Sequence, residues 1–576
     1  RSDAGEAGFV DALNAALRPP ATALMKAPTV DLGAAFSHVR VISVPGPQQE
    51  ALSISLMMRE VLETPSRTAA LITPDRRLAR RVASELRRWG IDIDDSGGTP
   101  ISETVPGVFL RLTVSAVASD AAPVPVLAAL KHPLAAAGMD AGGFRDRVRE
   151  MEIAILRGPR PAPGFWGLHA RLMHMGAKAE LTLWMEALAE MASPLTELIA
   201  SRNVAAIELL DAHIAFAEKL AASSDRAGFE RLWGGDAGES AAALINDLRA
   251  GIEALPPIAG RDWPALLDVM MEGLVVRPQY GRHPRLNIWG LLEARLQQAD
   301  LVILGGLNEG VWPPEPANDP WMSRPMREVF GLASQERRIG LTAHDFVQAI
   351  AAPDAVVTRS TRIDGSPTVP ARWLTRIETL LSAHNGGRDV LNRWAGEQEK
   401  WLAWQNAIDA RGDVSPAMAP APAPPPHARP DRFSVTEIET LLRDPYAIYA
   451  RRILELSALE PLDADPGAAE RGSIIHTAID RFIRETGDTT GEKALSRLLA
   501  IGEAEFAPWI DRPGIRAFWW PRFERIAEWV IALEKERATT TKRRHSEVEG
   551  TLNIYRGGKR FQLRARADRI EELEDG

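Results

Sequence analysis

The run Thr68-Ala69-Ala70-Leu71-Ile72-Thr73 is apolar or β-branched throughout and is closed by Pro74-Asp75, so it predicts a short buried strand followed by a turn. Beyond the turn, Leu78, Val82 and Leu86 recur at helical spacing until Gly90 ends the pattern. Further strand-like runs occupy residues 39–44, 286–289, 301–304 and 355–358. Strands that alternate with helices predict an α/β unit built on a parallel sheet.

Composition limits the classes of protein to consider. The 576 residues carry 68 Lys+Arg against 77 Asp+Glu, a net charge of -9, and contain no cysteine. This length implies several domains, and no apolar run is long enough to span a membrane. The lack of cysteine excludes disulfides, thiolate metal sites and cysteine nucleophiles, and we expect a cytoplasmic protein. The mild acidity argues against a general nucleic-acid coat, although a local basic channel remains compatible with it.

Changes in composition along the chain predict six segments. They are a lead-in at 1–37, the first half of the α/β unit at 38–123, a helical insertion at 124–271, the second half at 272–380, a helix with a Pro/Ala-rich linker at 381–432, and an α+β domain at 433–576. The chain starts at Arg1 and stops at Gly576 directly after a strand-like run. We therefore expect a fragment of a longer protein.

Candidate chemistry gathers in the last segment. His476 lies on a predicted helix, and Asp568 lies on a predicted strand whose same face carries Arg564 and Arg566. A carboxylate there can hold Mg²⁺ and the arginines can contact a phosphodiester. The alternative is a solvated strand face with local ion pairs. The chain contains no P-loop motif, and no helix-borne pair of histidines at metal-binding spacing.

Three motifs in this segment resemble those of the RecB-like PD-(D/E)XK nuclease domain. They are the stretch from Phe433 to Tyr446, Arg471-Gly-Ser-Ile-Ile-His476, and Arg564-Ala-Arg-Ala-Asp568-Arg-Ile570. The resemblance implies that His476 and Asp568 are catalytic residues that bind Mg²⁺, with a further acid and a lysine beyond Gly576. The fragment alone is then not expected to cleave DNA. Ala565 stands where this family often has glycine.

The upstream segments are similar to the second motor-like half of UvrD/RecB-type helicases. The motifs that carry this similarity are Trp289-Gly-Leu-Leu-Glu-Ala-Arg295 and Leu304-Gly-Gly-Leu-Asn-Glu-Gly-Val-Trp-Pro313. A P-loop-helicase-like unit, a proline-rich linker and then a nuclease follow the order of the AddB family, and the alphaproteobacterial type is the most similar. This resemblance implies a subunit that processes double-strand DNA ends and single strands for recombinational repair, as a heterodimer with an AddA-like helicase–nuclease subunit.

Two groups of arginines are candidate contacts for nucleotide or DNA. Arg337 and Arg338 resemble the helicase motif that reaches an ATP γ-phosphate. A structural or DNA-facing role is favoured, because the resemblance to the AddB family implies a second motor with a degenerate ATPase site. ATP binding stays open, since a Walker A motif would lie upstream. A predicted helix carries a cationic face that contacts either phosphates or solvent, and Arg566 on the hairpin is a further candidate for DNA binding. The residues of that helical face are Arg76, Arg77, Arg80 and Arg81.

Two further expectations concern the nuclease-like segment. In many relatives the first cysteine of an iron–sulfur cluster precedes a proline, and here Asp444 precedes Pro445, so we predict no cluster. We expect Trp519, Trp520 and Trp529 to be core residues, with base stacking as the alternative.

Two other functions fit the sequence. One is a non-catalytic DNA-binding scaffold. The other is an ATP-driven superfamily 1 helicase.

Overall fold

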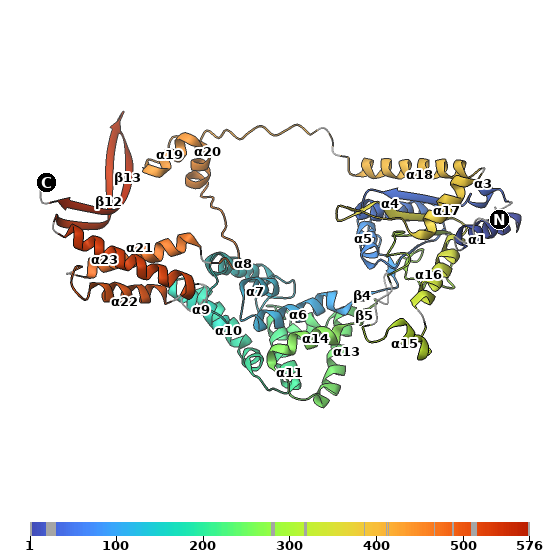
Figure 1. The fold of residues 1–576 in the computed structure, drawn as a ribbon, viewed down its shortest axis with the longest axis horizontal. Coiled ribbons are helices and arrows are strands. Elements are labelled where there is room, and N and C mark those ends of the chain that lie inside the picture. The colour runs from blue at the N-terminus through green and yellow to red at the C-terminus, as the bar shows by residue number, and fades with distance from the viewer. Residues whose placement is uncertain are drawn as a thin grey trace. The chain divides into compact units, whose positions relative to one another are not determined.

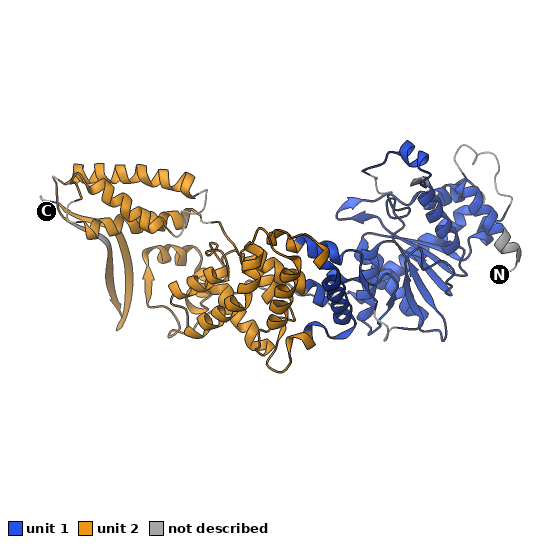
Figure 2. Cartoon of the chain, turned by 90° about the horizontal axis from the view of Figure 1, so that it is seen from below, with its two compact units in different colours: residues 1–108, 232–252, 265–415 blue, residues 109–231, 253–264, 416–576 orange. Residues whose placement is uncertain are grey.

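The computed structural model divides the chain into two compact units (Figure 2). Unit 1 comprises residues 1–108, 232–252 and 265–415, and unit 2 comprises residues 109–231, 253–264 and 416–576. The structure describes residues 3–18, 30–277, 283–315, 320–333, 335–384, 386–410, 412, 414–465, 467–486, 489–507, 515–538 and 540–573. It is a mixed α/β protein.

Unit 1 is built on a six-stranded sheet in which every pairing is parallel. In spatial order the strands are β1 (Val39–Val44), β8 (Ala355–Ser360), β7 (Leu301–Leu304), β2 (Ala69–Ile72), β6 (Leu286–Trp289) and β3 (Asp94–Asp95). All residues of β2, β7 and β8 are buried, as expected for strands covered on both faces. The strands predicted from apolar runs are thereby confirmed.

Helices cover both faces of this sheet (Figure 1). On one face, α4 (Pro47–Val61) and α5 (Arg76–Arg87) pack through residues such as Ile54 and Val82. The other face packs against α1 (Asp3–Leu17), α3 (Leu32–Ala35), α16 (Gln335–Ile350) and α17 (Arg372–Ala383). Helix α18 (Gly387–Ile408) contacts β1 and contributes Trp394 to one core and Trp401 to the other. Residues 1–37, expected to be only a lead-in, thus place two helices of the described part in this core.

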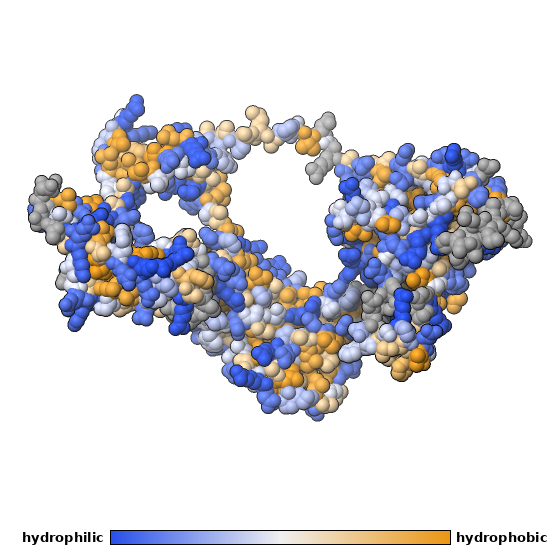
Figure 3. All heavy atoms as spheres, in the orientation of Figure 1, coloured by the Kyte–Doolittle hydropathy of each residue, from blue (hydrophilic) through white to orange (hydrophobic). Residues whose placement is uncertain are grey.

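The remaining elements of unit 1 are short strands and peripheral helices. They are β4 (Thr99–Pro100), β5 (Val275–Val276), β9 (Arg362–Ile363), β10 (Ser366–Pro367), α13 (Gly235–Gly251), α14 (Trp263–Met271) and α15 (Arg324–Val329). Apolar residues gather on the surface over α15, where Val329 and Phe330 are exposed (Figure 3).

A buried carboxyl ties the carboxyl ends of β7 and β8 to α4. Glu50 accepts hydrogen bonds from the backbone N–H of Gly306, from Thr358 Oγ1 and from Ser360 Oγ, at 2.8, 2.8 and 2.6 Å. Gly306 has φ +79°, a conformation that favours glycine. Asn308 of the same Leu304–Pro313 motif donates through Nδ2 to the carbonyl of Ser360. The described geometry gives this motif an internal structural role.

Unit 2 begins with a group of helices. They are α6 (Val105–Ala118, from residue 109 onward), α7 (Pro123–Leu130), α8 (Ala141–Met151), α9 (Phe165–His174), α10 (Ala179–Ala200), α11 (Ala206–Ala221) and α12 (Gly228–Leu232). The sequence pattern places the start of the helical insertion at residue 124, whereas the helices of this group begin earlier in the chain. Among the described residues, no helix combines the length and apolar character needed to cross a bilayer.

The last part of unit 2 contains a bundle of three helices and a three-stranded sheet (Figure 1). The bundle comprises α21 (Ala468–Glu485), α22 (Ala494–Phe506) and α23 (Trp520–Arg537), whose core includes Phe482, Phe506 and Phe523. The sheet comprises β11 (Arg432–Ser434), β13 (Lys559–Leu573) and β12 (Thr541–Arg556). Two short helices, α19 (Val435–Arg443) and α20 (Pro445–Ile448), follow β11 in the chain. The predicted hairpin is confirmed, with Gly557 and Gly558 at its turn.

Candidate functional site

His476 is an exposed residue of α21. The helix begins at Ala468, and the N–H of Gly467 donates to the Glu470 carboxylate at 2.7 Å, which fixes its first turn. Ala478 and Phe482 point into the bundle core and are fully buried, so core packing fixes the position of the helical turn that carries His476. The helix therefore presents His476 on its outer side.

His476 lines a cavity of about 560 Å³ between α21 and α23. One wall comes from α21 and the other from α23, each through residues three or four apart, which share one face of a helix. The lining residues are Ala468, Arg471, Gly472, Ile475 and His476 on α21, and Arg522, Arg525, Ile526 and Trp529 on α23. We call this cavity the α21–α23 hollow.

The hollow is cationic. Arg471, Arg522 and Arg525 line it, and no carboxylate is among its lining residues. Within the described part of the chain, none of these three arginines forms an ion pair or a side-chain hydrogen bond. Elsewhere on the bundle, Arg481 is bonded to Glu485 and Glu505 at 2.8 and 3.2 Å. The hollow thus carries positive charge that its own walls do not neutralise.

The prediction that all three tryptophans of α23 and its approach are core residues is wrong for Trp529. Trp519 and Trp520 pack against the bundle core, and the Trp520 ring contacts those of Phe506 and Phe523. Trp529 is 62% exposed and stands at the hollow, because position 529 shares the outer helix face with Arg522 and Arg525 rather than the inner face with Val530. The spacing Arg522, Arg525, Trp529 was the sequence signal for this cationic–aromatic face.

Asp568 lies on the exposed face of β13. The opposite face packs toward α23, where Arg569 donates to the buried Glu534 and Arg537 lies 3.2 Å from Glu571. Burial alone would raise the pKa of Glu571, but hydrogen bonds from these arginines outweigh it and lower that pKa. Arg566 is exposed on the same strand, opposite Glu549 in the hairpin register.

The described residues do not by themselves fit a Mg²⁺ ion. They include no group of three or more His, Cys, Asp or Glu side chains that is able to hold a metal. Asp568 is not among the lining residues of the hollow that contains His476, whose charged walls are arginines. A hard cation prefers oxygen ligands, and repulsion by arginine opposes its binding. The pairing of His476 with Asp568 in one metal site stays a prediction.

The predicted cationic helix is α5, whose N-terminus is capped by Asp75. Arg76 is bonded to Asp95 and Arg80 to Glu103. Arg77 and Arg81 are exposed and form no ion pair among the described residues. The structure therefore divides the four candidates into two whose charge is already paired and two that remain available to an external anion.

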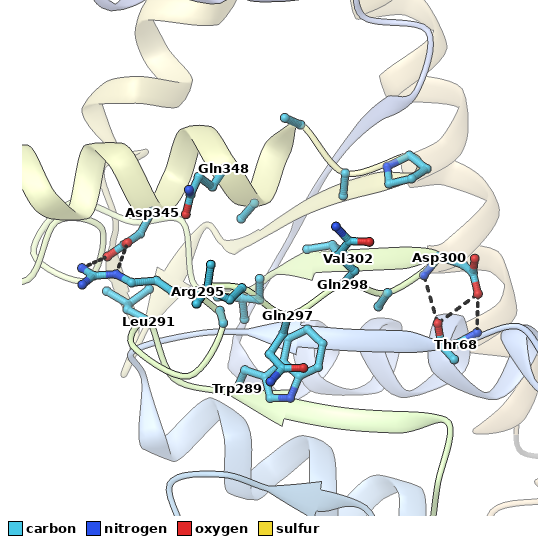
Figure 4. Close-up of a pocket in the computed structure, with 18 residues that line it drawn as sticks. Thr68, Trp289, Leu291, Arg295, Gln297, Gln298, Asp300, Val302, Asp345 and Gln348 are labelled. Atoms are coloured by element: carbon cyan, nitrogen blue, oxygen red, sulfur yellow. Dashed lines mark hydrogen bonds and ion pairs between the residues drawn. The ribbon is translucent and has the colours of Figure 1, made fainter. Parts of the chain in front are cut away.

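Arg337 and Arg338 are exposed in the first turn of α16. Further along α16, Asp345 and Gln348 line a second cavity, of about 660 Å³, to which neither arginine contributes (Figure 4). In this cavity, Arg295 binds both carboxylate oxygens of Asp345, at 2.7 and 3.0 Å. Asp300 is held by Thr68 (Figure 4). In this second cavity Arg295, Asp345 and Asp300 thus have bonding partners within the protein, whereas the arginine side chains of the α21–α23 hollow have none among the described residues.

Asp444, which stands before Pro445, caps α20. Its carboxylate accepts a hydrogen bond from the N–H of Ala447 at 3.2 Å. This position therefore has a local structural use for an oxygen acceptor.

Comparison with known proteins identifies the C-terminal part. Residues 432–576 match the PD-(D/E)XK nuclease superfamily, so the three-helix bundle and the hairpin lie in a nuclease-superfamily domain. Uncharacterized proteins of Rickettsia felis and Rickettsia bellii are 22% and 20% identical over 350 and 342 residues, in each case 59% of this chain. A Rickettsia typhi protein is 26% identical over 149 residues, 25% of this chain and 17% of its own. The chain spans about 39–40% of the length of the first two relatives.

Proposed function

We propose that this chain is part of an AddB-like subunit of a helicase–nuclease that processes double-strand DNA ends for recombinational repair. The observation that carries the proposal is the PD-(D/E)XK domain at residues 432–576, which supports nuclease activity in general. The parallel sheet of unit 1 is compatible with the helicase-like fold that its motifs resemble. A parallel-sheet unit followed by a nuclease-superfamily domain supports the proposal, because the resemblance to the AddB family implies this order.

His476 and Asp568 are the residues we propose for the nuclease site. Nucleases of this superfamily generally use Mg²⁺. Two side chains do not complete a magnesium site, so the proposal requires further oxygen ligands from other parts of the complete protein. His476 in the lining of the cationic hollow and Asp568 on an exposed strand face are both accessible to a DNA strand.

In the proposed complex, unit 1 serves as a scaffold that guides DNA, and an AddA-like partner supplies ATP-driven movement. The exposed Arg77 and Arg81 on α5, and Arg337 and Arg338 on α16, supply positive charge for phosphate contacts.

Degradation of linear and closed circular duplexes of one sequence tests this function. The complete protein with its AddA-like partner, ATP and Mg²⁺ is expected to shorten the linear duplex from its ends and to leave the closed circle intact. Equal attack on both substrates would contradict the role in end processing.

A non-catalytic DNA-binding scaffold is the second candidate. It is favoured by the three unpaired arginines of the hollow and by the absence, among the described residues, of a three-ligand metal cluster. This candidate predicts DNA binding by the complete protein with no strand scission of its own.

A further inference from the structure

The α21–α23 hollow has walls of fixed geometry. Its two walls are helices locked together by a common core that includes Phe482 and Phe523. Each wall contributes residues at successive turns, so the lining residues are held at fixed positions on the helix backbones. Its volume of about 560 Å³ falls within the range of roughly 300–1,000 Å³ that is typical of ligand pockets.

The charge of the hollow specifies an anionic ligand. Arginine is always protonated in proteins, so Arg471, Arg522 and Arg525 bring three positive charges to one cavity without a carboxylate in its lining. Their mutual repulsion is relieved when an anion binds between them. The planar guanidinium matches the geometry of phosphate through paired N–H donors.

Trp529 narrows the range of candidate ligands further. Trp529 shares the α23 face of Arg522 and Arg525 and is 62% exposed, although its size makes exposure costly. An exposed ring beside cations provides a stacking surface for a nucleobase, as in proteins that bind single strands. In an intact duplex the base faces are already stacked on one another. The combination therefore favours an unpaired strand.

We propose that the α21–α23 hollow binds single-stranded DNA, with Arg471, Arg522 and Arg525 on the backbone phosphates and Trp529 stacked on a base. The inference rests on the proposed function, because it takes DNA as the polymer that the nuclease-superfamily domain handles. The four residues are positioning residues. They hold an unpaired strand against the wall of α21 that carries His476.

The test measures binding of a fluorescent oligothymidylate to the complete protein by anisotropy, in a chelator so that no cleavage occurs. The double variant Arg522→Gln/Arg525→Gln is expected to weaken binding about 10–100-fold, as expected for loss of two charge-assisted phosphate contacts. It is also expected to reduce the slope of log affinity against log salt concentration by about 1.4, at about 0.7 for each phosphate contact. Trp529→Ala is expected to weaken binding about tenfold with little change in the slope, whereas Trp529→Phe retains most of the affinity.

The matched control is Arg497→Gln/Arg516→Gln, which removes the same charge from exposed positions of this domain that do not line the hollow. All substituted arginines and Trp529 are exposed, and circular dichroism verifies that each variant folds. Equal effects of the hollow and control variants would overturn the inference, as would a duplex that competes as well as the single strand. Binding that depends on the hollow in a protein that never cleaves DNA would support this inference and refute the proposed function. Cleavage at an unchanged rate by the hollow variants would support the proposed function and refute this inference.

Discussion

The variant Asp568→Asn is expected to reduce Mg²⁺-dependent DNA cleavage by the complete protein on the order of a thousandfold. Asp568 is the carboxylate that we propose for the metal site, and loss of such a ligand removes several kcal/mol of transition-state stabilisation. Asparagine keeps the size of the side chain, removes its charge and replaces one carboxylate oxygen by an amide NH₂ group. Asp568 is exposed, so the substitution leaves the packing of the hairpin intact. The rate of release of short labelled fragments from a linear duplex measures the effect, with the partner's own nuclease disabled.

Glu503→Gln is the matched control, since Glu503 is an exposed carboxylate of α22 in the same domain. It is expected to cleave at the rate of the unmodified protein. DNA binding in a chelator should be similar for both variants. Unreduced cleavage by Asp568→Asn would remove Asp568 from the nuclease site.

The variant Glu50→Ala is expected to destabilise unit 1 by about 3–5 kcal/mol, because it leaves three buried donors without their acceptor. These donors are the Gly306 N–H and the hydroxyl groups of Thr358 and Ser360. Glu50→Gln keeps an acceptor oxygen and nearly the same volume, so its cost at neutral pH is expected to be much smaller. Hydrogen exchange of the β7 and β8 amides measures the difference, and an equal loss of protection in both variants would contradict this account.

The stability difference between the unmodified protein and Glu50→Gln is expected to depend on pH. Burial raises the pKa of Glu50 above the 4.5 of an exposed glutamate, and the charge of Asp75 adds to this effect, against the opposing hydrogen bonds from Ser360, Thr358 and Gly306. A raised pKa in the folded state means that the contribution of Glu50 is fully present below pH 4.5 and declines as pH rises through the folded value. The stability of Glu50→Gln should therefore improve relative to the unmodified protein as pH increases above 4.5. Parallel stability profiles would show that Glu50 does not titrate in this way.

The sequence predicted the sheet of unit 1 well, because strands covered on both faces must be apolar along their whole length. The runs at 39–44 and 301–304 carry that signal, and β1 and β7 occupy them. Edge strand β3 was missed, since Asp94–Asp95 has neither the length nor the apolarity of a buried strand. Helix α1 was missed as well, although Phe9 and Leu13 belong to the core. Its Ala-rich surroundings show no strong amphipathic contrast.

The candidate site was predictable only in part. The motifs located the nuclease-superfamily domain. The roles of His476 and Asp568 stay predictions. The sequence did not predict which arginines form ion pairs, because ion pairing depends on residues brought together by the fold. Arg80 meets Glu103 across two elements, whereas Arg81 next to it remains unpaired among the described residues. The exposure of Trp529 depended in turn on which face of α23 packs against the bundle.

The most direct test of the central claim is cleavage by the complete protein itself. The measurement is the release of short fragments from an end-labelled linear duplex, with an AddA-like partner whose own nuclease has been inactivated by mutation. The account predicts fragments that accumulate in Mg²⁺ and cease when a chelator is added. An intact label in Mg²⁺, from a protein that still binds the duplex, would contradict the proposed nuclease and leave the DNA-binding scaffold as the function of this chain.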